Sequence, residues 1–382
     1  MIKQFRGILK IAFKLLVNDK RKFIALLVGI TFAVFLMIMM MSMFSGMLAR
    51  SAAPVFNIGA KIWVMDPAVN NATSSIPMPD YVLSNAKSIN GVKYAVPIYF
   101  GNALVKLKSG AYQAVNVVGL DDATLFGRPE LIAGKIEDIY AENAFFVVKD
   151  SEFRKLESPS IGAQFEINDH RGVIVGVAKV ASSGLFGVPT LYTTRHRAIT
   201  YIPTTRFTTS FVLIEPKRES DIPFIQKQIK KLGYQALTKA EFVEKISDFY
   251  TYQTGMGMNV LMMTAISFIV GLSISGQTFY TFILENLERF GALKAIGAKS
   301  HELISMILFQ ASFTALLGYG LGVGLASGLM MLARLRLPSY ASQVTYTNLT
   351  FAFVMVLIIA GVSSYIGVRK VLQIQPFDIF RG

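Results

Sequence analysis

Four long apolar runs divide the chain into alternating hydrophobic and polar segments. Residues 23–49, 255–284, 303–333 and 349–368 contain no Lys, Arg, Asp or Glu. A membrane-spanning helix needs about 20 consecutive apolar residues. The pattern therefore predicts an α-helical membrane protein with a bundle of four spans.

The polar segments between these runs differ greatly in length. Segments 1–22, 334–348 and 369–382 are short, and so is segment 285–302 between the second and third spans. Segment 50–254 is long enough to form a domain of its own. We predict that this large domain is inserted between the first and second spans.

Alternating apolar and polar positions predict a β-rich inserted domain with a few helices. Stretches 92–120 and 165–180 alternate and contain turn residues, so they are expected to form hairpins. Ser220 is placed to cap a helix, and Gly233 to stop it. The domain is therefore predicted to be α+β.

The end of the inserted domain is expected to form a stalk. Residues 241–252 have a helical pattern that leads directly into the second span. Gly255 and Gly257 interrupt this pattern and would allow a joint. We expect a continuous stalk, and a joint at these glycines is the alternative.

The N-terminal segment has the pattern of a helix that lies on a membrane surface. Its basic residues flank an apolar face formed by Ile2, Phe5, Leu9, Ala12, Phe13 and Leu16. The segment carries seven Lys or Arg against one Asp. This positive-inside bias places the N-terminus in the cytoplasm, and four spans then return the C-terminus to the same side.

Composition narrows the function classes. The chain has 382 residues, a net charge of +14 and no cysteine. Much of the excess charge lies beside the first span, because the large domain has 23 basic and 19 acidic residues. Nucleic-acid binding is therefore not expected. The absence of cysteine excludes disulfides and fits a bacterial envelope protein.

Segment 285–302 is amphipathic and lies between two spans. Apolar residues recur at every third position (Leu287, Phe290, Leu293 and Ile296), close to a helical stripe, and Gly297 follows as a helix stop. A surface helix held by two spans can receive a push from a soluble partner and pass it into the bilayer. We interpret the segment as a coupling helix.

This segment resembles the cytoplasmic coupling motif of ABC-transporter permeases of the MacB/FtsX type. The resemblance rests on Glu288, Arg289, Phe290, Gly291, Leu293, Lys294, Ala295, Ile296, Gly297 and Ala298. Segments 191–195 and 197–203 are similar to the DevC-like exporter branch, and segment 375–381 is similar to the family's C-terminal signature. The large domain is similar to the MacB-like periplasmic core domain.

The resemblance implies a partner set and a mechanism. A homodimer of the permease would pair with a dimer of separate ABC ATPase subunits in the bacterial inner membrane. Closure of the ATPases would push the coupling helices, and the spans would relay the motion to the periplasmic domains. A periplasmic adaptor and an outer-membrane duct are expected to complete the exporter.

Small residues recur along two of the spans. Such series let helices approach closely in lipid, within the chain or across a dimer. A pore lining is the alternative, but the spans carry no internal ionisable residue for an ion pathway. The predicted packing residues are Ser267, Gly271, Ser275, Gly318, Gly322, Gly324 and Gly328.

No catalytic or metal-binding set is expected. Segment 291–299 echoes a phosphate loop, but five residues separate its glycines and Lys299 does not follow the second glycine directly. The three histidines have no second ligand at metal-binding spacing. We therefore expect no cofactor and no enzyme activity in this chain, with ATP hydrolysis on the partner.

Two local charge clusters have simple interpretations. Arg195, His196 and Arg197 would suit an anionic headgroup, although a solvated surface cluster is the simpler interpretation. Asp121 and Asp122 are expected to begin a turn.

Two other functions share this architecture. An FtsX-like permease regulates a cell-wall hydrolase and exports nothing, and a lipoprotein-releasing permease uses the same spans. The sequence leaves the cargo open.

Overall fold

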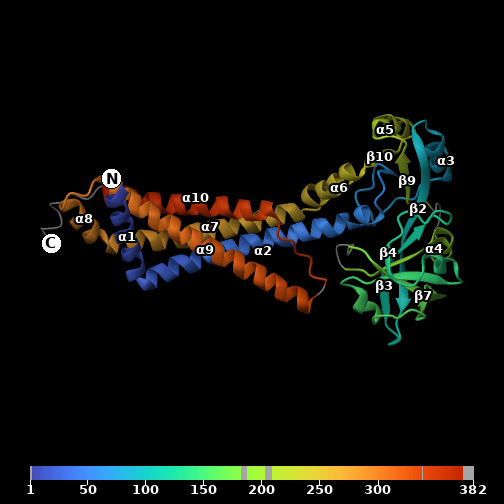
Figure 1. Cartoon of the computed structure of the whole chain (residues 1–382), viewed down its shortest axis with the longest axis horizontal. Coiled ribbons are helices and arrows are strands. Elements are labelled where there is room, and N and C mark those ends of the chain that lie inside the picture. Colours follow the sequence, from blue (N-terminus) through green and yellow to red (C-terminus); the bar gives the residue numbers. More distant parts are fainter. Residues whose placement is uncertain (1, 182–186, 203–208, 338, 373–382) are drawn as a thin grey trace. The chain divides into compact units, whose positions relative to one another are not determined.

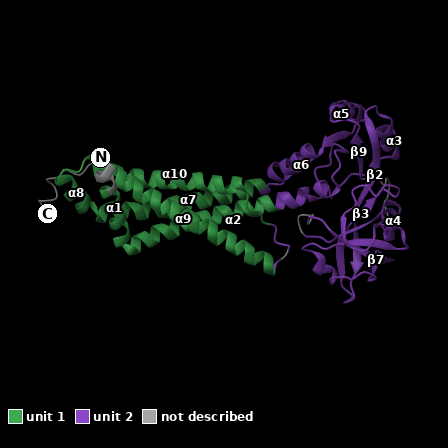
Figure 2. Ribbon diagram, viewed as in Figure 1, with its two compact units in different colours: residues 1–46, 257–336, 342–382 green, residues 47–256, 337–341 purple. Residues whose placement is uncertain are grey.

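The computed structural model describes residues 2–181, 187–202, 209–337 and 339–372 of the chain. These residues form two compact units (Figure 2). We call residues 1–46, 257–336 and 342–382 the helical unit, and residues 47–256 and 337–341 the inserted unit. The C-terminal signature at 375–381 lies outside the described residues.

Long apolar helices dominate the helical unit (Figure 1). Four helices are long and apolar enough to cross a membrane, within the described ranges. They are α2 (Lys20–Ile58), α7 (Met256–Glu285), α9 (Ser300–Arg336) and α10 (Tyr346–Leu372). Two shorter helices are α1 (Ile2–Asn18) and α8 (Leu287–Ala295). The prediction of a four-span bundle is confirmed.

Helix α2 extends well beyond the predicted first span. It continues through Pro54 to Ile58, and its residues from Met47 onward belong to the inserted unit. Pro54 has no backbone N–H to donate to the carbonyl of Arg50, one turn earlier. The helix nevertheless continues, so α2 carries one uninterrupted stretch of backbone into the inserted unit.

Three of the predicted packing glycines allow helices to approach α2 closely. A Cβ on Gly318 of α9 would lie 2.6 Å from Ile30, and one on Gly322 would lie 2.6 Å from Val34. On α7, a Cβ on Gly271 would clash with Ala33. Helices α7 and α9 therefore each approach α2 closely at these glycines, while α9 also packs along α10.

The other predicted packing residues divide into two groups. Ser267 and Ser275 are buried on α7. Gly324 and Gly328 have open space where a side chain would stand, with no described atom within 4 Å. A packing role for these two glycines within the chain is therefore not seen, and a role across a dimer stays a prediction.

Helix α1 packs against α9. Ala12 and Leu16 are fully buried, and the amide of Gln310 donates to the Ala12 carbonyl at 2.8 Å. The rings of Phe13 and Phe313 meet edge to face at 5.3 Å. Part of the apolar face expected to meet lipid is therefore covered by protein.

The described residues of the inserted unit form ten strands in the order β10-β1-β9-β2-β3-β8-β5-β7-β4, with β6 pairing with β2 and β7. The strands are β1 (Ile62–Met65), β2 (Val92–Lys106), β3 (Tyr112–Leu120), β4 (Glu130–Ala133), β5 (Ala144–Val148), β6 (Gln164–Ile167), β7 (His170–Lys179), β8 (Thr190–Thr194), β9 (Phe211–Pro216) and β10 (Gln235–Thr238). Long β2 joins two parts of the unit, because it pairs first with β9 and then with β3.

Short helices cover the sheet. They are α3 (Asp80–Ser88), α4 (Arg195–Tyr201), α5 (Ile222–Lys231) and α6 (Lys239–Asp248), with the 3₁₀ helices η1 (Ile136–Tyr140), η2 (Phe153–Leu156) and η3 (Glu219–Asp221) and the π-helix η4 (Phe249–Gln253). One apolar core centres on Trp63, whose ring meets Phe211 edge to face at 5.3 Å. The α+β prediction is confirmed.

Both predicted hairpins are present. Strands β2 and β3 pair from Tyr99↔Gly119 to Lys106↔Tyr112, with Gly110 at φ +83° in the turn. Strands β6 and β7 turn tightly at Asn168 and Asp169, both with positive φ. Ser220 does not cap α5, because it lies inside η3 and Asp221 takes the cap position.

The predicted stalk is interrupted before the second span. Thr238 and Glu241 form a capping box that starts α6, and η4 follows it directly. Gly255 then adopts a φ of +73°, and α7 begins at Met256. The expectation of a continuous stalk is therefore wrong and the joint is at Gly255, whereas Gly257 lies inside α7.

Candidate functional site

The coupling segment forms helix α8 between α7 and α9, at the same end of the helical unit as α1 (Figure 1). The helix is shorter than the predicted segment 285–302. After Ala295, the amides of Gly297 and Ala298 donate to the carbonyls of Lys294 and Leu293 at 3.1 and 3.0 Å. Gly297 has a φ of +101°, so the predicted glycine stop is confirmed.

The apolar residues of the segment do not share one face. Phe290 and Gly291 are buried, whereas Ile296 is 83% exposed. A spacing of three residues falls short of the 3.6-residue helical turn, so each step rotates the stripe backward. Over the three steps from Leu287 to Ile296 this rotation amounts to about half a turn. The prediction of a single apolar stripe is therefore wrong for Ile296.

The segment has two distinct sides as a result. Phe290 faces the helical unit, where α8 contacts α10, and Leu287 and Leu293 are half-buried. The exposed residues of the predicted set are Glu288, Arg289, Ala295, Ile296 and Gly297, and Lys294 and Ala298 are partly exposed. The exposed side is available to a partner.

Polar contacts attach the start of α8 to the helices beside it. Asn286 is buried, donates to the Phe282 carbonyl at 2.8 Å and accepts from the Arg289 guanidinium at 2.8 Å. Glu285 at the end of α7 forms an ion pair with Lys22 at the start of α2. The segment is therefore linked directly to α7 and, through that ion pair, to α2.

A hollow lies beside the coupling segment in the helical unit. It has a volume of about 530 Å³, and α1 residues form most of its lining together with Arg289 of α8. Lys14, Lys20 and Arg289 give this hollow a basic character.

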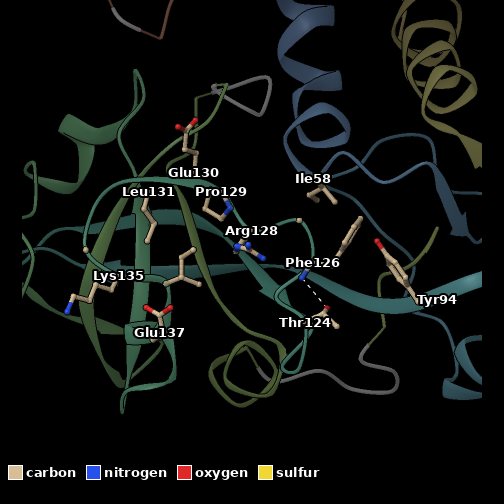
Figure 3. A pocket seen from close by; sticks show the side chains of 13 residues that line it. Ile58, Tyr94, Thr124, Phe126, Arg128, Pro129, Glu130, Leu131, Lys135 and Glu137 are labelled. Atoms are coloured by element: carbon tan, nitrogen blue, oxygen red, sulfur yellow. Dashed lines mark hydrogen bonds between the residues drawn. The ribbon is translucent and has the colours of Figure 1, made fainter.

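A larger cavity of about 950 Å³ lies in the inserted unit (Figure 3). The rings of Tyr94 and Phe126 meet edge to face at 5.7 Å beside Ile58. Arg128 lies in the middle of the lining in this view, with Lys135 and Glu137 further along it. The cavity can hold an apolar group against the two rings, within reach of charges of both signs.

Sequence reasoning did not find this cavity. Its lining comes from α2, β2, β4 and η1, and from a turn with two positive φ angles, at Leu125 and Gly127. The only sequence signal was the expected turn at Asp121, which is confirmed because Asp121 accepts from the Thr124 amide at 3.0 Å and hydroxyl at 2.8 Å.

The arginine cluster on α4 is structural. Arg197 donates to the carbonyls of Ile139, Ala141 and Ala144 at 2.9, 2.7 and 2.6 Å. Burial lowers the pKa of its guanidinium, but those carbonyls satisfy the donors. Arg197 therefore braces η1 and β5, which contradicts an anion site or a solvated position for this residue, whereas His196 beside it is exposed as expected for a surface cluster.

Among the described residues, four membrane-length helices, a domain inserted between the first two and a short helix between the middle two define a multi-pass membrane protein. Residues 23–232 match the MacB-like periplasmic core domain, and residues 261–376 match the FtsX-like permease C-terminal domain. The chain belongs to the MacB/FtsX family of ABC-transporter permeases. Permeases of this type work with an ABC ATPase and reside in the inner membrane.

Curated relatives match parts of the chain. A protein named as a hemin transport system permease, HrtB, of Staphylococcus haemolyticus is 24% identical over 41% of this chain and 42% of its own length. A macrolide export ATP-binding/permease protein, MacB, of Rhodopseudomonas palustris is 29% identical over 33% of this chain and 20% of its own length. The chain thus spans less than half the length of either relative. The narrower resemblance to the DevC branch stays a prediction.

Two solved structures align with about half of this chain. The extracellular domain of the ABC-type transporter YknZ from Gram-positive bacteria aligns with a TM-score of 0.36 and 15% identity, over 47% of this chain and 99% of that domain. The periplasmic region of MacB from Actinobacillus actinomycetemcomitans aligns with a TM-score of 0.39 and 9% identity, over 51% and 96%.

Proposed function

We propose that this chain is the permease subunit of an ABC exporter, which receives motion from a separate ATPase at α8 and transmits it to the inserted domain. The observation that carries the proposal is the two-sided coupling segment. Phe290 anchors α8 in the helical unit, while an exposed side remains for the partner.

The exposed side has the chemistry of a protein contact. Ile296 offers a large apolar side chain that is 83% exposed, next to exposed Ala292 and Ala295. Glu288 and Arg289 lie on the same short helix and are exposed as well. A central apolar anchor with polar residues around it is typical of protein interfaces.

The contacts of α8 provide a route for the motion. A push on α8 reaches α7 through Asn286 and α2 through the Glu285–Lys22 ion pair. Helix α2 packs against α9 and α7 at Gly322 and Gly271, so these spans are expected to move together. Helix α2 then continues without interruption into the inserted unit.

The orientation follows from charge. The seven basic residues of segment 1–22 favour a cytoplasmic N-terminus. With four spans, α8 and both termini then face the cytoplasm, and the inserted domain faces the periplasm. This arrangement places α8 on the side where ATP is available.

Export is supported by the name of one relative, a macrolide export protein, and transport by the name of the other, a hemin transport system permease. In the proposed assembly two permease copies pair with two ATPase subunits. A periplasmic adaptor and an outer-membrane duct would carry the cargo onward. In this proposal the ATPase subunits hydrolyse the ATP, and segment 291–299 of the permease, which lacks the spacing of a phosphate loop, takes no part in it.

The test is ATPase stimulation in a reconstituted complex. Ile296→Asp should abolish the stimulation of the cognate ATPase by the permease, because it places a charge in the apolar centre of the contact. The permease should still fold, since Ile296 is exposed. Ile132→Asp, at another exposed isoleucine on β4, is the matched control and should stimulate normally.

Phe290→Asp serves as a second comparison. Phe290 is fully buried, so this change should lower the yield and melting temperature of the permease itself. Normal stimulation by the Ile296→Asp permease would refute the proposed contact.

A further inference from the structure

One fully buried carboxylate, that of Glu152, lies in the inserted unit with no exposed surface. Glu152 directly precedes η2. Leaving a carboxylate uncompensated in a protein interior is costly, so a buried one needs charged or hydrogen-bonding partners. The segments that supply those partners are the ones that Glu152 connects.

Four side chains donate to this carboxylate. Oε1 accepts from Ser151 at 2.8 Å and from the Arg50 guanidinium at 3.4 Å. Oε2 accepts from the Lys155 ammonium at 2.7 Å and from the Ser339 hydroxyl at 2.8 Å. Two cations and two hydroxyls therefore surround one anion.

The surroundings leave little space for an alternative arrangement. Gly187 has a φ of +62°, and a Cβ there would lie 2.6 Å from the Glu152 carboxylate. The Lys155 ammonium also donates to the Gly187 carbonyl at 2.5 Å. A side chain at position 187 would therefore collide with the Glu152 carboxylate.

Two of the partners come from segments that connect with membrane-length helices. Arg50 lies on α2, one residue beyond the apolar run 23–49. Ser339 lies between α9 and α10, in the short stretch 337–341 that belongs to the inserted unit, while both helices belong to the helical unit. Glu152 therefore holds α2 and the α9–α10 loop together.

The inserted unit connects with α7 through a glycine rather than through a buried ion pair. There the backbone turns at Gly255, which has a positive φ and no described atom near its Cβ position. A glycine in open space can change conformation easily. The backbone at Gly255 can therefore bend where the inserted unit joins α7. The contacts of Glu152, in contrast, fix Arg50 and Ser339 in place.

We propose that Glu152 is a positioning residue that fixes α2, through Arg50, and the α9–α10 loop, through Ser339, to the inserted domain. Motion of the spans then reaches the domain at two held points, while the Gly255 joint bends. This inference rests on the proposed function, because it concerns how ATP-driven motion is delivered.

The first experiment needs neither ATP nor the partner. The chain has no cysteine, so Tyr340→Cys introduces a unique thiol beside Ser339. The Tyr340→Cys permease is labelled with a maleimide in nanodiscs. Labelling should become at least fivefold faster when Ser339→Ala or Glu152→Gln is added, because the loop is then no longer held. Glu166→Gln is the matched control, since Glu166 forms an exposed ion pair with Lys106 at 3.2 Å. Equal labelling rates in all four proteins would overturn the proposal.

The second experiment measures transmission in the complex with the ATPase. A fluorophore on Lys108→Cys, at the exposed β2–β3 turn, reports motion of the inserted domain. The ATP-driven signal should fall by at least half with Ser339→Ala, at an unchanged melting temperature, and should not fall with Glu166→Gln. An undiminished signal with Ser339→Ala would overturn the positioning role.

The two experiments separate the two proposals. If the protein with native Glu152 and Ser339 shows no ATP-driven signal, the proposed function fails, while the labelling rates still decide whether Glu152 holds the loop. Glu152→Gln can also destabilise the domain by leaving Arg50 and Lys155 without their anion. Ser339→Ala removes only one hydroxyl and leaves Glu152 paired with Arg50 and Lys155. It therefore tests the proposal even if Glu152→Gln unfolds the domain.

Discussion

At the scale of the residue, the Glu152 carboxyl links protonation to stability. Burial by itself raises its pKa, but hydrogen bonds from Lys155, Ser151 and Ser339 outweigh burial, and the net pKa lies below the ordinary value of 4.5. A depressed pKa means that the folded protein favours the charged form. The charged groups around it are Arg50 and Lys155, with Asp150 accepting from the Glu152 amide at 2.9 Å.

A pH dependence follows for the stability of the inserted domain. The stabilising contribution of Glu152 is present above the unfolded-state pKa and is lost as the pH falls through the lower folded-state pKa. At pH 7, Glu152→Gln should cost about 2 kcal/mol of unfolding free energy. Urea denaturation should show this difference shrinking as the pH falls below about 4.5. A difference that grows toward acid would contradict the assignment.

Only part of the residue-level detail could be predicted. The coupling segment could be predicted, because it is a short charged stretch between two apolar runs that contain no charge. It did not reveal which side of the helix Ile296 occupies, since a spacing of three only approximates a helical period. The Glu152 contacts were also beyond prediction, because Arg50 and Ser339 lie 102 and 187 residues away in the chain.

At the scale of the element, small residues on α7 and α9 bring both helices close to α2. Gly318 and Gly322 of α9 and Gly271 of α7 each approach it more closely than a side chain would allow. Close approach at small residues is how spans gain packing energy in lipid. The sequence predicted this use for the small residues, but it did not distinguish these glycines from Gly324, which has open space in front of it.

A substitution series should separate packed from open glycines. Gly322→Leu should destabilise the helical unit by about 1–3 kcal/mol, because the new side chain would collide with Val34. Gly361→Leu on α10 is the matched control, with no described atom within 4 Å of its Cβ position. Thermal unfolding in detergent would measure both. Equal melting temperatures for the two variants would contradict the packing around α2.

Element boundaries were predicted unevenly. The hairpins were found because alternation and turn residues agree in them, whereas β1 was missed because its four residues are all buried and show no alternation. The stalk was expected to continue into α7, but one glycine at φ +73° interrupts it. A helical pattern before a glycine does not reveal whether the helix continues beyond it.

At the scale of the whole molecule, we propose that a push at α8 becomes motion of the inserted domain. The family assignment establishes an ABC-transporter permease with a MacB-like periplasmic core domain. What remains to be tested is the route. In our proposal it starts at the exposed side of α8, passes through Lys22 and Glu285 into α2, and continues through Arg50 and Glu152.

The most direct test of this route uses the fluorophore on Lys108→Cys in nanodiscs that contain the permease and its ATPase. We predict that ATP changes the fluorescence of the permease with native Ile296, and that Ile296→Asp abolishes the change while Ile132→Asp preserves it. A full ATP-driven change in the Ile296→Asp permease would contradict the account, because motion would then reach the inserted domain without entering through α8.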